Sequence, residues 1–273
     1  APLWGFAAHP LVDGQKLITL VGGPGSVAVA VDKDTGKELW RALFAKEPGY
    51  CPPMIYEAGG QRQLIVWHPE ALNSLDPETG RVFWTQPFAS KAGLTIATPR
   101  QLGDLLLVTA FYNGSLMMRL DASQPTATEV WRGKSQSERN TDGLHSIIST
   151  PFLEKGHIYG VCSYGQLRCL KAATGERLWE TLQVTTPDGK EMRWANAFLI
   201  KHEDRFFLSN EKGDLILARL TPSGYEEISR APVLEPTNRD PGRAVVWSHP
   251  AFANRCLYAR NDKEIVCVSL AAD

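Results

Sequence analysis

The chain has 273 residues, of which 43% are hydrophobic and 22% charged, and its formal net charge at pH 7 is −1. This length allows a substantial core, and a charge this close to zero creates no field that would attract a nucleic acid. No basic run occurs, and no apolar stretch reaches the roughly 18 residues of a membrane span. The start, Ala-Pro-Leu, has no signal-peptide features. We therefore expect no nucleic-acid partner and no membrane-spanning helix.

A phrase of about ten residues recurs along the chain, as expected for a repeat protein. The first copy reads Val-Asp-Lys-Asp-Thr-Gly-Lys-Glu-Leu-Trp, which predicts a strand end, a tight turn and a second strand. The five copies lie at residues 31–40, 75–84, 120–131, 170–179 and 220–228. The copy at 120–131 has a longer turn, and the last copy has Ile228 in place of Trp. Successive tryptophans are 44, 47 and 48 residues apart: Trp40, Trp84, Trp131 and Trp179.

Each unit has a fuller form around this phrase. After the Trp come a polar loop, a small or polar residue usually followed by Pro, and short apolar runs separated by Gly, Asn and Asp turns. Four short strands per period of about 40 to 50 residues are typical of a propeller. We predict an all-β fold, a β-propeller of six four-stranded units forming a single domain over residues 1–273, with the last unit incomplete. The units span about 4–40, 50–84, 96–131, 147–179, 194–228 and 245–273.

These units resemble PQQ-like (quinoprotein-type) β-propeller repeats, including those of outer-membrane assembly lipoproteins. The resemblance covers residues 4–270, and its motif is specific for the fold and weak for function. It implies that the repeat tryptophans pack flat between neighbouring blades. The sixth unit departs from the pattern because it stops at Leu270 before any Thr-Gly or Trp. We expect the sixth blade to lack its fourth strand or to borrow one. Longer family members have further blades, so the chain is either a six-unit propeller or part of an eight-bladed one.

The five cysteines leave at least one without an intramolecular partner. Cys162 and Cys169 flank one predicted hairpin turn, and Cys256 and Cys267 flank another. We expect each pair to lie on one face of its hairpin as diagonal neighbours. Either they are small apolar strand residues, or they form disulfides, which would indicate an exported protein. Cys51 has no partner in the sequence.

Two short motifs have a functional and a structural interpretation. The glycine cluster at 22–25 could cradle a phosphate, but a β-rich run follows it where a helix N-terminus would be needed, so we predict a hairpin tip. Asn113-Gly114-Ser115 matches a glycosylation sequon, but Asn-Gly is also the preferred pair of a tight hairpin turn. We predict the turn.

One face of the propeller is the better candidate for binding. In an antiparallel four-stranded blade, the inter-blade connections and the tips between strands two and three emerge on the same side. These connections are long and irregular, and long loops on a rigid scaffold tend to carry binding residues. We call this side the loop face. Its connections are 41–51, 85–97, 132–149, 180–195 and 229–248, and its tips are 22–25, 68–71, 112–115, 164–165, 210–213 and 261–263.

The candidate binding residues lie on this loop face or at the mouth of the central channel. They are His9, His68, Glu70, Arg139, His145, Trp194, Asn196, Trp247, His249 and Arg260. The residues that begin the inner strands are predicted to ring the mouth: His9, Cys51, Thr98, Ser149, Asn196 and His249. Both histidines of this ring precede Pro and could instead cap a strand. Trp194 and Trp247 could form an aromatic platform or pack between blades. No His or Cys spacing indicates a metal site, and we assign no catalytic residue.

Three functions follow from these features, because a widely reused fold does not determine function. The first is a non-catalytic scaffold, periplasmic or otherwise exported, that binds a protein or an extended ligand through the loop face without a cofactor. The second is a PQQ-dependent dehydrogenase, or a fragment of one. That class uses adjacent cysteines and a calcium ion, and this chain has no Cys-Cys pair. The third is a glycan hydrolase or lyase using His68, Glu70 and His145 as acid–base groups. We predict the scaffold.

Overall fold

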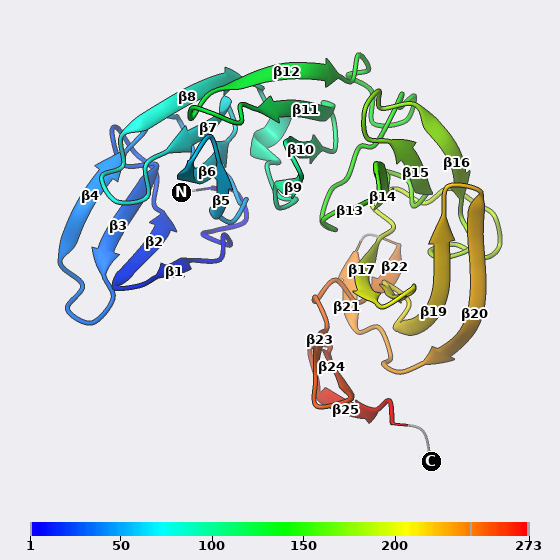
Figure 1. Ribbon diagram of the computed structural model, residues 1–273. Coiled ribbons are helices and arrows are strands. Elements are labelled where there is room, and N and C mark those ends of the chain that lie inside the picture. The colour runs from blue at the N-terminus through cyan, green and yellow to red at the C-terminus, as the bar shows by residue number, and fades with distance from the viewer. Residues whose placement is uncertain (1, 241, 272–273) are drawn as a thin grey trace. The chain divides into compact units, whose positions relative to one another are not determined.

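The structure, a computed structural model, describes residues 2–240 and 242–271, and its regular secondary structure is almost entirely antiparallel strand (Figure 1). A short 3-10 helix, η1 (Lys91–Gly93), is the only helix in these residues. The all-β prediction is confirmed. The chain divides into two compact units. Unit 1 runs up to Ile147 and includes Leu153–Gly156 and Ala172–Gly175, and unit 2 contains Ile148–Phe152, His157–Lys171 and the residues from Glu176 onward. Whether these two units form the predicted single domain depends on how they join, so that part stays a prediction.

Unit 1 contains three four-stranded sheets, the first three blades, and in each the spatial order of the strands follows the chain. The first is β1 (Leu11–Asp13), β2 (Lys16–Leu20), β3 (Ala28–Asp32) and β4 (Glu38–Ala42). The second is β5 (Met54–Ala58), β6 (Gln61–His68), β7 (Ala71–Leu75) and β8 (Val82–Pro87). The third is β9 (Arg100–Leu102), β10 (Leu105–Ala110), β11 (Gly114–Leu120) and β12 (Ala127–Arg132).

The later sheets belong mainly to unit 2. The fourth blade is β13 (Phe152–Glu154), β14 (His157–Val161), β15 (Leu167–Lys171) and β16 (Arg177–Thr181), and the fifth is β17 (Ala197–His202), β18 (Arg205–Asn210), β19 (Asp214–Thr221) and β20 (Gly224–Pro232). A hairpin that the sequence did not predict, β21 (Asn238–Asp240) with β22 (Arg243–Val245), lies in the following connection. The sixth blade is β23 (Ala251–Ala253), β24 (Cys256–Arg260) and β25 (Ile265–Ser269).

The recurring phrase produces the same local structure in each copy. In the first copy the Asp32 carboxylate accepts hydrogen bonds from the Thr35 amide (2.8 Å) and hydroxyl (2.7 Å), and Gly36 has a φ of 72° that favours glycine. The pairing register between the third and fourth strands shifts just before the Trp in the first four blades, and it shifts at Ile228 in the fifth. The turn chemistry therefore fixes the start of the fourth strand, and with it the position of the Trp.

The repeat tryptophans contact the neighbouring blade in two ways. The indole N–H donates to a carbonyl in the next repeat's turn at Trp40 (Pro77 O, 3.2 Å), Trp131 (Ala172 O, 2.8 Å) and Trp179 (Thr221 O, 2.8 Å). The Trp84 indole donates instead to Gln63 Oε1 in its own blade at 3.0 Å, while its ring packs on the core shared with the third blade.

The apolar core lies between successive sheets. One cluster joins the first and second blades around Ile18, Trp40 and Leu64, and another joins the second and third around Trp67 and Leu106. In unit 2 a third cluster joins the fourth and fifth blades, and a fourth joins the fifth and sixth. The second and fifth sheets contribute side chains from both faces, which explains the nearly continuous burial of central strands such as β7.

The sixth blade has three strands over the described residues, as the missing Thr-Gly-Trp phrase predicted. Its third strand, β25, alternates between exposed and half-buried residues. The equivalent strands of the second and fourth blades, β7 and β15, are buried almost throughout. Over the described residues β25 pairs with β24 alone, and Ile265 is 74% exposed.

The two hairpin cysteine pairs behave differently. Cys267 on β25 pairs with Tyr258 on β24, and Tyr258 lies two residues beyond Cys256 on that strand. Cys256 and Cys267 are therefore diagonal neighbours on one face, as predicted. The prediction for Cys162 and Cys169 is wrong. Cys169 pairs with Tyr159, and Tyr159 lies three residues before Cys162. Because side chains alternate between the two faces of a strand, an odd separation places the two cysteines on opposite faces. The loop between β14 and β15 has one residue more than the loop between β24 and β25, which changes the parity.

Candidate functional site

Hydrogen bonds join the blade tips to the inter-blade connections, so the two sets of loops form common surfaces within each unit. In unit 1, Pro69 O in the second tip accepts from the Ser90 amide at 2.7 Å. In unit 2, Glu211 O in the fifth tip accepts from the Val246 amide at 2.8 Å, and Asn261 in the sixth tip donates to Glu235 O at 2.9 Å. This arrangement agrees with the loop face expected from topology.

A buried carboxylate organises the loop face of unit 2. The side chain of Glu211, which is 2% exposed, receives the Arg243 guanidinium on both oxygens, at 2.8 and 3.2 Å, and the Trp247 indole N–H at 2.9 Å. Arg243 also donates to Asp240 (2.6 Å) and to the carbonyl of Arg193 (2.9 Å). Every charge in this cluster therefore has a partner, as burial requires.

Three of the predicted binding residues meet in this cluster. Trp247 donates to Glu211 as described, and the carbonyl of Asn196 accepts from the Glu211 amide at 3.1 Å. Trp194 lies beside them with the Arg193 guanidinium carbon 4.4 Å from its ring centroid, in a left-handed backbone conformation (φ 65°). The side chain of Asn196 is buried, and its Nδ2 has no hydrogen-bond partner. Both tryptophans are half-buried in loop contacts.

The sequence did not single out Glu211, Arg243 or Asp240. Glu211 occurs in an ordinary Asn-Glu-Lys-Gly tip, and its partner lies 32 residues away in a connection of no repetitive pattern. The only signal was the length of that connection, which the hairpin β21–β22 explains by presenting Asp240 and Arg243 to the tip.

In unit 1 the second tip brings His68 and Glu70 together. The Nδ1 atom of His68, a buried residue, accepts the Glu70 amide at 3.3 Å, and the Glu70 carboxylate accepts the Lys46 amide at 2.9 Å. Burial lowers the pKa of His68, and the nearby Glu70 charge opposes this only in part. The neutral imidazole is therefore the form that the fold favours.

This lowered pKa predicts a loss of stability at mildly acidic pH. Between the lower folded pKa of His68 and its unfolded value of about 6.5, the unfolded chain binds more protons, so the free energy of unfolding rises with pH. The stability that neutral His68 contributes is fully present above a pH of about 6.5 and is lost as the pH falls through the pKa of His68 in the folded protein. When denaturant unfolding is measured at a series of pH values, the free energy of unfolding should fall less steeply with decreasing pH for His68→Asn than for wild type. The exposed His9→Asn is the control, and equal slopes for all three proteins would contradict the assignment.

His145 is fully buried in the connection after the third blade. Its Nδ1 contacts Phe111 O at 3.1 Å and its Nε2 contacts Asp142 Oδ1 at 3.4 Å. Burial opposes ionisation of Asp142, but the amides of Lys134 and Ser135 and the imidazole outweigh it and lower the Asp142 pKa. A β-carbon on Gly114 (φ 69°) would lie 2.9 Å from His145 Nε2. The imidazole thus holds the loop against the Asn-Gly tip, and that tip forms the predicted hairpin turn.

The remaining predicted binding residues are exposed. His249 is exposed, with its ring 4.6 Å from that of Phe198 and its Nδ1 2.8 Å from Pro250 O. His9, Arg139 and Arg260 are exposed. Of the other residues predicted at the channel mouth, Cys51 and Ser149 are buried, and burial raises the Cys51 thiol pKa.

An aromatic patch on the first blade was missed by the sequence analysis. Phe44 is 75% exposed, Phe6 63%, Trp4 59% and Val21 44%. Trp4 packs edge-on against Tyr50, with ring centroids 5.7 Å apart. Phe6 and Val21 line one cavity of about 240 Å³ with Lys46 and Glu47, and the Phe44 ring lies over the first tip at Gly25. We call Trp4, Phe6, Val21 and Phe44 the aromatic patch. The sequence contains no clear signal, because Phe88 follows Trp84 at the spacing at which Phe44 follows Trp40 and is nevertheless buried.

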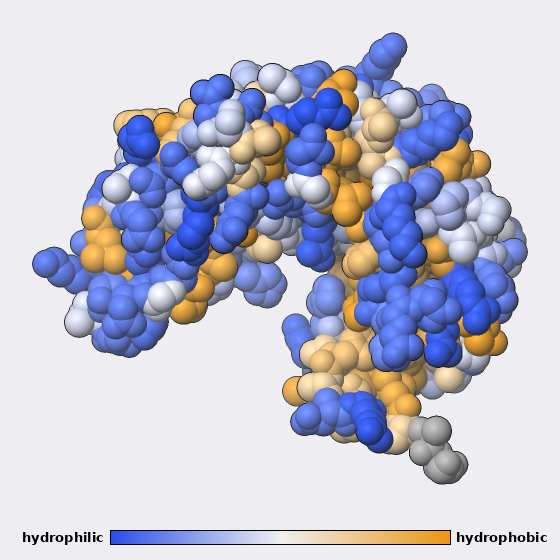
Figure 2. Space-filling view, in the orientation of Figure 1, coloured by the Kyte–Doolittle hydropathy of each residue, from blue (hydrophilic) through white to orange (hydrophobic). Residues whose placement is uncertain are grey.

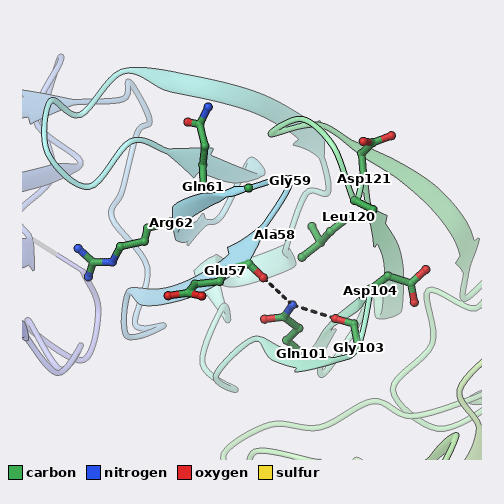
Figure 3. Close-up of a pocket in the computed structure, with 12 residues that line it drawn as sticks. Glu57, Ala58, Gly59, Gln61, Arg62, Gln101, Gly103, Asp104, Leu120 and Asp121 are labelled. Atoms are coloured by element: carbon green, nitrogen blue, oxygen red, sulfur yellow. Dashed lines mark hydrogen bonds between the residues drawn. The ribbon is translucent and has the colours of Figure 1, made fainter.

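A larger cavity, of about 580 Å³, lies on the opposite side, among the short turns of the second and third blades (Figure 3). Gln101 spans it by donating to Glu57 O (3.3 Å) and Gly103 O (2.8 Å). Asp104 pairs with Arg119 at 2.9 Å, and the Ser123 backbone and hydroxyl lower the pKa of Asp121. The carboxylates of Asp104 and Asp121 are therefore occupied by interactions that stabilise their own turns and the adjacent strand.

Within residues 2–240 and 242–271, no group of three or more His, Cys, Asp or Glu side chains is placed to hold a metal ion. In the same residues, no helix has both the length and the apolar character needed to cross a membrane.

Comparisons with known proteins identify the family. The family model described as outer membrane protein assembly factor BamB matches residues 23–272. BamB of Burkholderia pseudomallei (strain K96243) is 25% identical over 186 residues, covering 61% of this chain and 45% of that protein, so the chain spans under half of that relative. The solved structure of BamB from Moraxella catarrhalis matches with a TM-score of 0.63 and 17% identity, covering 94% of this chain and 67% of that one.

A second solved structure shares the architecture but not the name. The quinohemoprotein alcohol dehydrogenase from Comamonas testosteroni matches with a TM-score of 0.62 and 14% identity, covering 93% of this chain and 51% of that one. At these identities the solved structures show the fold alone, a β-propeller. The family model covers most of the sequence, and the chain therefore belongs to the family described as outer membrane protein assembly factor BamB.

Proposed function

We propose that this chain is a non-catalytic scaffold of the bacterial periplasm that holds a protein partner on its loop face during outer-membrane protein assembly. The aromatic patch is the observation that carries the proposal. Large apolar side chains exposed together on a soluble surface mark binding sites, and aromatic residues are enriched in protein interfaces. Lys46 and Glu47 at its edge provide the polar rim that such interfaces have.

The ionisable groups on the loop face support a structural use over a catalytic one. Glu211 is bound by Arg243 and Trp247, and His68 accepts a backbone amide. His145 lies between a carbonyl and Asp142. A general acid or base needs a face open to the substrate proton, and each of these groups already has a structural partner. The rigid loops would hold the exposed patch in one orientation for a partner.

Cross-linking in bacterial cells tests the proposal. A photoreactive phenylalanine analogue at Phe44 should give a discrete adduct with a second protein, and Phe6→Ala should reduce that adduct severalfold by removing an aromatic anchor. Matched probes at Val12 and Leu39, which are 60% and 48% exposed on the strands of the same blade, should give none. Equal adducts from all three positions, or none from Phe44, would contradict the proposal.

The alternative is a PQQ-dependent dehydrogenase, which the likeness to a quinohemoprotein alcohol dehydrogenase brings into consideration. Under our proposal the chain works without PQQ or calcium. Thermal unfolding should therefore be unchanged by PQQ with calcium. A saturable stabilisation at micromolar quinone that a chelator removes would favour the dehydrogenase instead.

A further inference from the structure

Two cysteines in the sixth blade differ from the rest in their exposure. Cys51, Cys162 and Cys169 are at most 1% exposed, whereas Cys256 is half-buried and Cys267 is exposed. Both lie on the face of the sheet that turns away from the core shared with the fifth blade, since that core takes Leu257, Val266 and Val268 from the alternate positions. Figure 2 shows apolar residues at the surface over this sheet.

The two cysteines are neighbours on one face of the sheet. Tyr258 pairs with Cys267 and Ser269 with Cys256, which makes the cysteines diagonal neighbours across β24 and β25. The Cys267 thiol raises the pKa of Cys256 and of Tyr258, in agreement with this proximity.

The sheet also allows the small movement that a bond between them needs. Diagonal residues in an antiparallel pair have Cα atoms about 7–8 Å apart, just beyond the distance that a disulfide spans without backbone movement. A strand paired on both sides could not shift to shorten this distance without breaking a ladder. Among the described residues β25 pairs with β24 alone and therefore lies at the edge of its sheet. A bond formed in this way would be strained and exposed, which are the properties of reducible disulfides.

We propose that Cys256 and Cys267 form a reversible dithiol–disulfide site that reacts with small-molecule disulfides. The Cys267 thiolate attacks one sulfur of the small disulfide, forming a mixed disulfide and releasing one thiolate. The Cys256 thiolate then attacks the Cys267 sulfur, closing the protein disulfide and releasing a second thiolate. The two cysteine protons pass to the two released thiolates, so the protein loses two hydrogens and the small disulfide becomes two thiols.

The experiment incubates the full chain with glutathione disulfide, quenches it with acid and measures intact mass before and after alkylation. Wild type should lose the mass of two hydrogens, and alkylation should fall by two sites, mapped to Cys256 and Cys267. Cys256→Ser should instead accumulate a single glutathione adduct on Cys267. Cys162→Ser is the matched control and should close as wild type does, because its cysteine is buried in the fourth blade. Added glutathione should reopen the wild-type bond.

Two results would overturn the proposal. One is a wild-type chain that keeps the glutathione adduct as stably as Cys256→Ser does, which would show that Cys256 does not reach Cys267. The other is a disulfide linking two chains, seen as a dimer on non-reducing gels. Thermal unfolding of Cys256→Ser, expected near wild type because its side chain lies outside the core, and of Cys162→Ser verifies that either result comes from a folded protein.

Discussion

Replacing Glu211 with alanine should lower the free energy of unfolding by about 3 kcal/mol. The substitution removes the acceptor of two Arg243 hydrogen bonds and of the Trp247 indole, all in a site where Glu211 is 2% exposed. Breaking a buried ion pair from one side is costly because the remaining charge is left without compensation. Arg243 keeps Asp240 and is 17% exposed, so the effect should lie at the lower end of the range for such pairs.

Chemical denaturation with fluorescence from Trp247 and the other tryptophans gives the measurement. Glu226→Ala is the matched control, since its carboxylate pairs with Arg219 on the same blade at 65% exposure and should cost under about 1 kcal/mol. Glu211→Gln keeps an acceptor for the indole and should fall between the two. Equal stability of Glu211→Ala and Glu226→Ala would show that the cluster does not hold the loops of unit 2.

Replacing Gly213 with alanine should have a comparable or larger effect, about 3–5 kcal/mol, because two penalties combine. Gly213 has a φ of 84°, which disfavours any side chain, and its new β-carbon would lie 1.7 Å from Leu234 O. That oxygen belongs to the backbone and cannot rotate away. Gly213 O also accepts the amides of Val233 and Leu234, so a shift of the tip breaks two hydrogen bonds and moves the nearby Glu211.

A second glycine separates the two penalties. Gly189 has a similar φ of 76° but open space around the β-carbon position, so Gly189→Ala should cost only the backbone term, about 1 kcal/mol. The difference between the two variants in denaturant unfolding measures the collision with Leu234. If both variants lose the same stability, the collision is relieved by loop movement, and the tip is less rigid than its contacts imply.

Much of the fold could be predicted from sequence because its information is local. In the first two copies the Asp carboxylate accepts a hydrogen bond from the Thr of the same turn, as Asp32 does from Thr35, and this sets the turn and the following strand. The absence of the phrase after Leu270 likewise predicted the three-stranded sixth sheet. The exact length of a hairpin loop is harder to predict. One extra residue in the loop between β14 and β15 places Cys162 and Cys169 on opposite faces, and the sequence analysis missed it.

The sequence by itself determined the repeat, its turns, the propeller blades and the side on which long loops emerge, since each depends on hydrogen bonds or periodicity within one unit. Tertiary structure alone decided which loop residues meet. Glu211 and Arg243 are 32 residues apart, the Trp84 indole donates to Gln63 in its own blade, and the aromatic patch is exposed. Contacts between distant loops depend on where packed sheets place them, and burial depends on the neighbouring blade. A local sequence pattern predicts neither the contacts between distant loops nor the burial of their side chains.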